Sequence, residues 1–130
     1  MAFTIAVTTD LEFDDAVEAT RTALGEVGFG VLTEIDLAAT LKEKIGAQIP
    51  PYLILGACRP PLAEAAVRAD PSVGALLPCN VVVRREGTHT VVEAMDPGVI
   101  TQLSGQSVLA EVAADAQQRL TQALQTVAAR

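Results

Sequence analysis

Two cysteines, Cys58 and Cys79, are the residues whose type and context are best suited to chemistry. Cys58 ends the apolar segment "YLILGAC" and is followed by Arg59 and two prolines, whereas Cys79 begins the apolar segment "CNVVV". Prolines suit the first turn of a helix, so the thiol of Cys58 is expected beside a helix N-terminus. The positive end of the helix dipole and the neighbouring arginine both favour a thiolate. The sequence therefore predicts a nucleophilic thiolate at Cys58.

Cys79 is the candidate that would resolve a mixed disulfide or persulfide formed at Cys58, provided that the two residues meet. If their strands run antiparallel, the cysteines become cross-strand neighbours with Cα atoms about 4.5–5.5 Å apart, within reach of a disulfide. If the connection is a right-handed parallel crossover, the sulfurs lie at opposite ends of the sheet. The residues alone leave both arrangements open.

The sequence around both cysteines forms a candidate ligand-binding or thiol-reactive site at one end of the sheet. Its residues are Gly56, Cys58, Arg59, Pro78, Cys79 and Asn80, and the amide of Asn80 is expected to position a ligand. In a competing interpretation the cysteines are packed as small apolar side chains, and the protein is a non-catalytic module for a small apolar ligand or a protein partner. No cofactor is predicted, and the sequence does not decide whether the protein is an enzyme.

Other titratable residues give weaker signals. His89 is the only histidine and follows a predicted hairpin turn, so it is expected at an exposed strand position without a chemical role. Two cysteines and one histidine are one ligand short of a closed zinc site, so a thiolate metal site needs ligands from two protomers. The acidic residues between Asp10 and Glu18 lie at a helix start, where they compensate the helix dipole.

Hydrophobic periodicity predicts alternating strands and helices. Strands are expected at residues 2–10, 29–36, 52–58, 80–86 and 89–95, and helices at 12–28, 37–45, 61–69 and around 109–127. Phe3, Ile5 and Val7 are expected on the inner face of the first strand. Asp36 is expected to cap the second helix, and Gly46 to end it. This order predicts an α+β fold, a mostly antiparallel sheet with helices on one face, in a single domain spanning residues 1–130.

Composition excludes several classes of partner. The 130 residues carry a net charge of −7, and only 3% are aromatic, with no tryptophan. Phosphate backbones and anionic membranes require a positive surface, so we expect neither nucleic acid nor membrane as a partner. No apolar run is long enough for a membrane span or a signal peptide, and two cysteines suit a reducing compartment. We therefore expect a cytoplasmic protein whose partner is a small molecule or a thiol.

Four segments resemble a known family. They are "ILGAC" followed by Pro60, "GALLPCNVVV" from Gly74, "GFGVLTEID" from Gly28, and the pair Asp96–Pro97. In these four segments the sequence resembles the uncharacterised prokaryotic family called domain of unknown function 302. The resemblance implies a curved sheet like one half of the TATA-binding protein (strand, helix, four-stranded meander, helix) and a homodimer. It favours the antiparallel arrangement of the cysteine strands and implies no activity. Family members typically have asparagine where this chain has Arg59.

Overall fold

Five strands form one antiparallel sheet in the computed structural model, which describes residues 2–130. The sheet order is β1-β5-β4-β3-β2, so β2 to β5 form a meander and β1 joins its far edge against β5. The strands are β1 Thr4–Thr9, β2 Gly30–Asp36, β3 Tyr52–Cys58, β4 Cys79–Glu86 and β5 His89–Met95. The predicted α+β fold with its antiparallel meander is confirmed.

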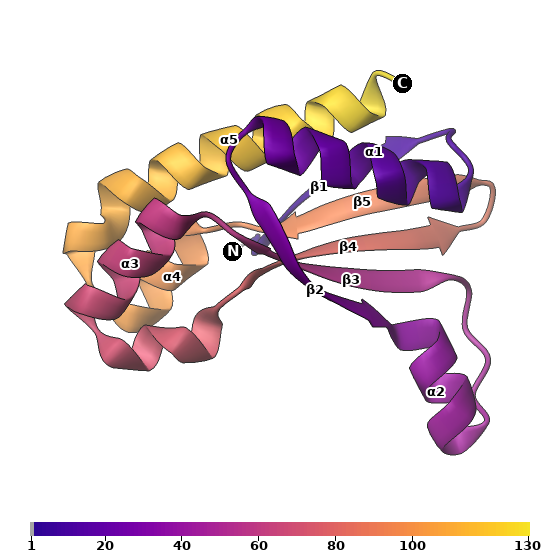
Figure 1. Ribbon diagram of the computed structural model, residues 1–130, viewed down its shortest axis with the longest axis horizontal. Helices are drawn as coiled ribbons and strands as arrows, with labels where there is room; N and C mark the ends of the chain where they lie inside the picture. Colours follow the sequence, from indigo (N-terminus) through magenta and orange to yellow (C-terminus); the bar gives the residue numbers. More distant parts are fainter. Residues whose placement is uncertain (1) are drawn as a thin grey trace.

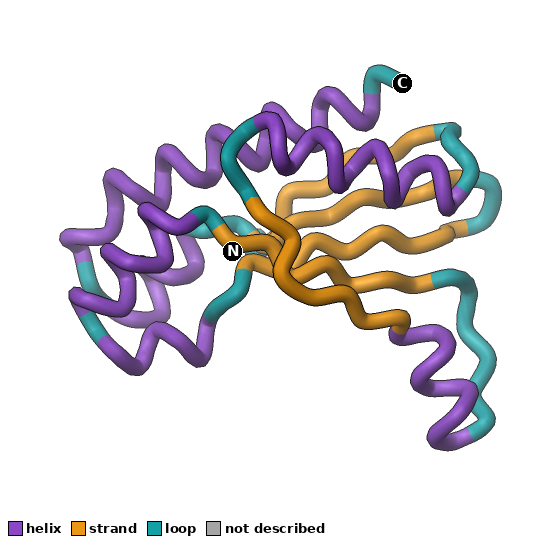
Figure 2. Tube along the Cα trace, viewed as in Figure 1, coloured by secondary structure: helices purple, strands orange, loops and turns teal. Residues whose placement is uncertain are grey.

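The helices are distributed unevenly around this sheet (Figure 1). They are α1 Phe13–Glu26, α2 Leu37–Ile45, α3 Pro60–Ala69, α4 Gly98–Ser104 and α5 Ala110–Ala128, with short 3₁₀ helices at Pro71–Leu76 and Ser107–Leu109. Figure 2 shows α1 and α5 lying side by side over one face, while α3 and α4 gather at one end of the sheet. Helix α4 was not predicted from the sequence.

The core lies between the sheet and helices α1 and α5. Alternation along the strands directs one set of side chains into it, for example Leu53, Leu55 and Ala57 on β3. Cys79, Val81 and Val83 of β4 belong to the same set. Burying each valine or leucine contributes about 1.5–3 kcal/mol.

The first strand departs from its expected pattern because it begins only at Thr4. Phe3 lies before it with 65% of its surface exposed, so the inward position expected for Phe3 is wrong.

Helix α2 has both of the ends predicted for it. The Asp36 carboxylate accepts a hydrogen bond from the backbone N–H of Ala39 at 2.9 Å. Gly46 ends the helix with φ +68°, a left-handed conformation that favours glycine. Yet none of the α2 residues is buried, and the helix projects away from the body of the molecule (Figure 1).

Candidate functional site

The end of β3 and the first turn of α3 border a cavity of about 290 Å³, here called the β3–α3 cavity. Its lining is mostly apolar, and Arg59 is its only charged residue. The lining residues are Leu32, Ala57, Cys58, Arg59, Leu62, Ala63, Leu77, Pro78 and Cys79. Four of the six predicted site residues, Cys58, Arg59, Pro78 and Cys79, are therefore brought together around one cavity.

The two cysteines are not opposite each other, although β3 and β4 run antiparallel as the family resemblance implied. The residue paired with Cys79 is Ala57, so the register is displaced by one from a Cys58–Cys79 pair. Successive residues of a strand point to opposite faces, and Cys58 therefore leaves the face that Ala57 and Cys79 share. Both cysteines are free thiols. The prediction of directly opposed cross-strand cysteines is wrong by one residue of register.

The surroundings of the two thiols differ. Cys79 is 2% exposed and belongs to the hydrophobic core, whereas Cys58 is half-buried. Burial raises the pKa of the Cys79 thiol to about 11, and electrostatic repulsion from Cys58 adds a smaller contribution in the same direction. Near neutral pH only about one Cys79 in ten thousand is then a thiolate. Cys79 therefore acts as a small apolar side chain in the cavity wall.

Arg59 forms an ion pair with helix α5. Its Nη2 lies 3.2 Å from Asp115 Oδ2, and its Nε donates to the same oxygen at 3.3 Å. Asp115 Oδ2 also accepts from Arg119 Nε at 2.9 Å, and Arg119 Nη1 donates to the carbonyl of Val27 at 3.2 Å. The hydrogen bond from Arg119 is the largest cause that holds the pKa of Asp115 below its ordinary value, and Arg59 adds to it. This charged group ties the β3–α3 corner and the end of α1 to α5.

A glycine makes room for the Arg59 side chain. Gly28 has φ +89°, and a Cβ placed there would lie 2.9 Å from Arg59 Nη1. Any larger residue would therefore combine an unfavourable backbone conformation with displacement of the guanidinium. The Arg59 side chain is 15% exposed.

The N-terminus of α3 offers fewer hydrogen-bond donors than an ordinary helix. Pro60 and Pro61 occupy its first two positions and have no backbone N–H. The N–H of Ala63 is already bonded to the carbonyl of Arg59 at 3.1 Å. Leu62 therefore supplies the one N–H of the first turn that lacks an intrahelical partner. The role of this helix end in stabilising a Cys58 thiolate stays a prediction.

Gly56 and Asn80, the other two predicted site residues, form a cross-strand pair outside the cavity lining. Gly56 lies under Thr33 of the neighbouring strand and beside the ring of Pro78, where a Cβ would contact Thr33 Oγ1 and approach Pro78 Cγ to 2.9 Å. Asn80 is exposed. The missing side chain of Gly56 thus leaves room for the wall residue Pro78. The ligand-positioning role of Asn80 stays a prediction.

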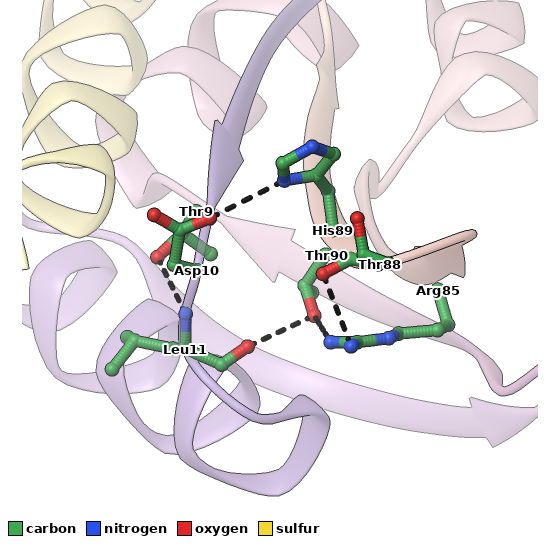
Figure 3. A network of polar contacts seen from close by, with 7 residues as sticks. All are labelled: Thr9, Asp10, Leu11, Arg85, Thr88, His89 and Thr90. Carbon is green, nitrogen blue, oxygen red and sulfur yellow. Dashed lines mark hydrogen bonds and ion pairs between the residues drawn. The ribbon is translucent and has the colours of Figure 1, made fainter.

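His89 lies at the opposite end of the sheet from the cysteines, in the polar network of Figure 3. Its Nδ1 lies 3.3 Å from Asp10 Oδ1, and both side chains are exposed. Beside it, Thr90 Oγ1 donates to the Leu11 carbonyl at 3.1 Å and accepts from Arg85 Nη1 at 3.0 Å. The network joins the β4–β5 hairpin to the loop before α1, which is a structural role.

Neither a cluster of three metal-ligating side chains nor a helix suited to crossing a membrane occurs within residues 2–130. A larger cleft of about 440 Å³ lies between α2 and the start of α1, and Asp36, Lys42 and Tyr52 are among its lining residues. It contains none of the predicted site residues.

Comparison with known proteins assigns the chain to a family. The model of the family "Domain of unknown function DUF302" matches residues 5–127. The chain belongs to the DUF302 family. It is also similar to the crystal structure of an uncharacterized conserved DUF302 protein from Bacillus stearothermophilus, with a TM-score of 0.90 and 29% identity over 98% of this chain and 99% of that one. No functionally curated protein matches this DUF302 chain.

Several residues around the DUF302 cavity were not predicted. Leu32 reaches the lining from the β2 irregularity between Val31 and Thr33. Ala57, Leu62, Ala63 and Leu77 carry no chemical signal in the sequence. Asp115 and Arg119 were detectable only as an oppositely charged pair four residues apart on a predicted helix. Nothing local connects that pair with Arg59.

Proposed function

We propose that the protein binds a small, largely apolar molecule in the β3–α3 cavity. The supporting observation is a cavity of about 290 Å³ whose lining is apolar except for Arg59, with the half-buried thiol of Cys58 in its wall. Small-molecule sites typically combine such an apolar lining with a few fixed polar groups. Cys58 and Arg59 are the polar groups here, and Cys79 and Pro78 complete the wall.

The number of carbons that leave water sets the expected affinity of an apolar ligand. A probe with six carbons, such as hexanol, gains about 0.8 kcal/mol for each CH₂ that leaves water. The total of about 4–5 kcal/mol corresponds to a Kd near 1 mM for this minimal probe.

Alkylation of Cys58 reports on occupancy of the cavity. In a Cys79→Ala variant Cys58 is the only thiol. We expect millimolar hexanol to slow the reaction of Cys58 with iodoacetamide, and mass spectrometry measures the rate of this reaction. Ala63 lines the cavity, so Ala63→Leu fills part of it and is expected to remove the hexanol effect. Ala128→Leu makes the same change at an exposed position of α5 and serves as the matched control. Equal protection in the Ala63→Leu and Ala128→Leu proteins would contradict the proposal.

A thiol-reactive function at this site is the second candidate, and the half-buried position of Cys58 favours it. Because Cys79 is buried and its pKa is raised to about 11, this candidate assigns nucleophilic chemistry to Cys58 alone. The pH dependence of Cys58 alkylation tests it. A midpoint well below the ordinary value for free cysteine, about 8.5, supports it, and a midpoint at or above that value contradicts it.

We also propose that the protein forms a homodimer through α2 and its following loop, residues 37–49, here called the α2 arm. Ile45 is 74% exposed at its tip, and a nine-residue helix gains little stability without packing partners. Lys42 and Lys44 are the only lysines of the chain, and neither forms an ion pair within the described residues. The α2 arm is mostly apolar and, with Glu43 between the two lysines, carries one net positive charge, which matches the acidic surface of a second copy on a chain of charge −7.

The first turn of α1, with Glu12, Asp14 and Asp15, is the complementary surface. It lies at the same end of the molecule as the α2 arm (Figure 1), so a two-fold axis would bring each arm to the acidic turn of the partner. Sedimentation equilibrium should then show a dimer that Lys42→Glu/Lys44→Glu dissociates. Mixing that variant with Asp14→Lys/Asp15→Lys should restore dimers, whereas a monomeric wild type or an unaffected variant contradicts the interface.

The free thiols suit a reducing compartment, and we propose the cytoplasm. Fractionation of cells that express the tagged protein tests this location. Recovery in a fraction other than the cytoplasm would contradict it.

A further inference from the structure

The β3–α3 cavity offers a ligand almost no polar surface. Its exposed atoms are nearly all apolar, although Arg59 belongs to the lining. The guanidinium group of Arg59 is engaged by Asp115 on α5 and lies against Gly28. A ligand in this cavity is therefore held by contacts with carbon and sulfur atoms, and charge or hydrogen bonding contributes little.

Two thiols are the only nucleophilic side chains among the described residues of the lining, and they are not equivalent. Cys79 is 2% exposed, and burial raises its pKa to about 11, so it stays protonated near neutral pH. Cys58 is half-buried and carries the accessible thiol of the wall. The lysines and the histidine of the chain lie elsewhere: Lys42 and Lys44 on the α2 arm, and His89 at the opposite end of the sheet. A carbon electrophile that enters the cavity thus meets one available nucleophile.

We infer that Cys58 captures small apolar electrophiles of the α,β-unsaturated aldehyde class, which bind in the β3–α3 cavity before they react. The inference rests on the proposed function and deepens it by naming a substrate class for the thiol-reactive site. Capture keeps the aldehyde in the cavity as a covalent adduct of Cys58.

The capture step is an addition in which atoms and electrons balance. The Cys58 thiolate attacks the β-carbon of the aldehyde, so that a carbon–sulfur bond forms and the carbon–carbon double bond becomes a single bond. The electron pair passes to the carbonyl oxygen as an enolate, and the α-carbon then takes a proton in place of the one that the thiol lost. The product is a thioether that carries a saturated aldehyde, and neither an oxidant nor a reductant is required.

Selectivity for an apolar chain follows from the lining. Leu62, Ala63 and Leu77 border the same space as Cys58, so the alkyl chain of the aldehyde leaves water when its β-carbon reaches the thiol. The aldehydes trans-2-hexenal and crotonaldehyde share one reacting group and differ by two CH₂ groups. Burial of two CH₂ groups corresponds to about a tenfold gain in binding. A thiol without a cavity, such as that of glutathione, lacks this gain.

The rates of adduct formation test this selectivity. In the Cys79→Ala variant, mass spectrometry measures the second-order rate constants of Cys58 with both aldehydes, and peptide mapping separates Cys58 adducts from lysine adducts. We expect the ratio of the hexenal rate to the crotonaldehyde rate to be about tenfold higher for Cys58 than for glutathione. Equal ratios for Cys58 and glutathione overturn the inference.

Two variants at residues of matched exposure locate the selectivity. Leu32 lines the cavity and is 67% exposed, so Leu32→Ser removes part of the apolar wall without disturbing the core and should lower the ratio toward that of glutathione. Leu103 is 66% exposed on α4, outside the lining, and Leu103→Ser should leave the ratio unchanged. A ratio that is the same in both variants overturns the inference.

The hexanol experiment distinguishes this failure from failure of the ligand-binding function. If hexanol slows the alkylation of Cys58 but the aldehyde ratio equals that of glutathione, the cavity binds apolar molecules and only the capture of electrophiles is overturned. If hexanol leaves the alkylation rate unchanged, the proposed ligand-binding function is overturned, and the inference with it.

Discussion

Substitution of Gly56 by alanine tests how tightly the strands are packed behind the cavity wall. An added Cβ would overlap with Thr33 Oγ1 on β2 and lie 2.9 Å from Pro78 Cγ, and neither neighbour is the far end of a long flexible side chain. Overpacking of this kind typically costs about 1–3 kcal/mol. Gly56→Ala should therefore lower the free energy of unfolding by about 2 kcal/mol.

Urea unfolding followed by circular dichroism measures this loss. With an m value of about 2 kcal/mol/M, the midpoint should fall by about 1 M. Gly30→Ala is the matched control, because Gly30 also lies in a strand and a Cβ there would meet no atom within 4 Å. Without a clash, reduced entropy of the unfolded chain should raise the stability of the Gly30→Ala protein by about 0.4–1 kcal/mol.

A double-mutant cycle identifies the cause. Thr33→Ala removes the closest contact, so the Gly56→Ala/Thr33→Ala protein should regain most of the lost stability, leaving the smaller conflict with Pro78. Thr33 is exposed, so its own replacement should change stability by no more than about 0.5 kcal/mol. If Gly56→Ala is as stable as Gly30→Ala, or if Thr33→Ala restores nothing, the steric argument is refuted.

Three further predictions concern titration and capping. Because burial raises the pKa of Cys79 from 9.0 to about 11, the folded state disfavours ionisation. The wild type should lose about 2–3 kcal/mol of stability between pH 9 and pH 11, and urea unfolding of Cys79→Ala should lack that part of the slope. The pKa of Asp115 is lowered by Arg119 and Arg59, so its stabilisation is present above the ordinary value of 3.8 and is lost on acidification. Asp115→Asn should therefore lose less stability than the wild type below pH 4, and parallel acid limbs would contradict this. Asp36→Ala removes the N-cap of α2 and should destabilise that helix by about 1 kcal/mol. Amide hydrogen exchange should then become faster only in residues 37–45. Faster exchange throughout the protein would contradict a local role.

Features encoded by neighbouring residues were predictable. Asp36 and Gly46 bound α2 as expected, since a side-chain cap and a left-handed glycine act within a few residues. The turn between β4 and β5 likewise follows from Gly87 and its flanking apolar runs. Phe3 shows where this reasoning fails, because alternation alone does not indicate the residue at which pairing begins.

Features that depend on register or on distant segments were not predictable. The displacement that pairs Cys79 with Ala57 is a single residue, and the helical connection between the two strands carries no local signal for it. The contact between Arg59 and Asp115 joins residues separated by 56 positions. Leu32 reaches the cavity lining from an irregularity in β2 that its own sequence does not indicate.

The position of β1 has a consequence for the order in which the sheet is completed. Strands β2 to β5 pair with neighbours in the chain, so each can join the sheet soon after it is synthesised. Among the described strands, β1 pairs with β5 alone, in a register that includes Thr4 with Met95. At about 5–20 residues per second, the ribosome takes roughly 4–17 s to reach Met95 after Thr9. β1 is therefore made before every other strand of this sheet and waits for its partner strand during that interval.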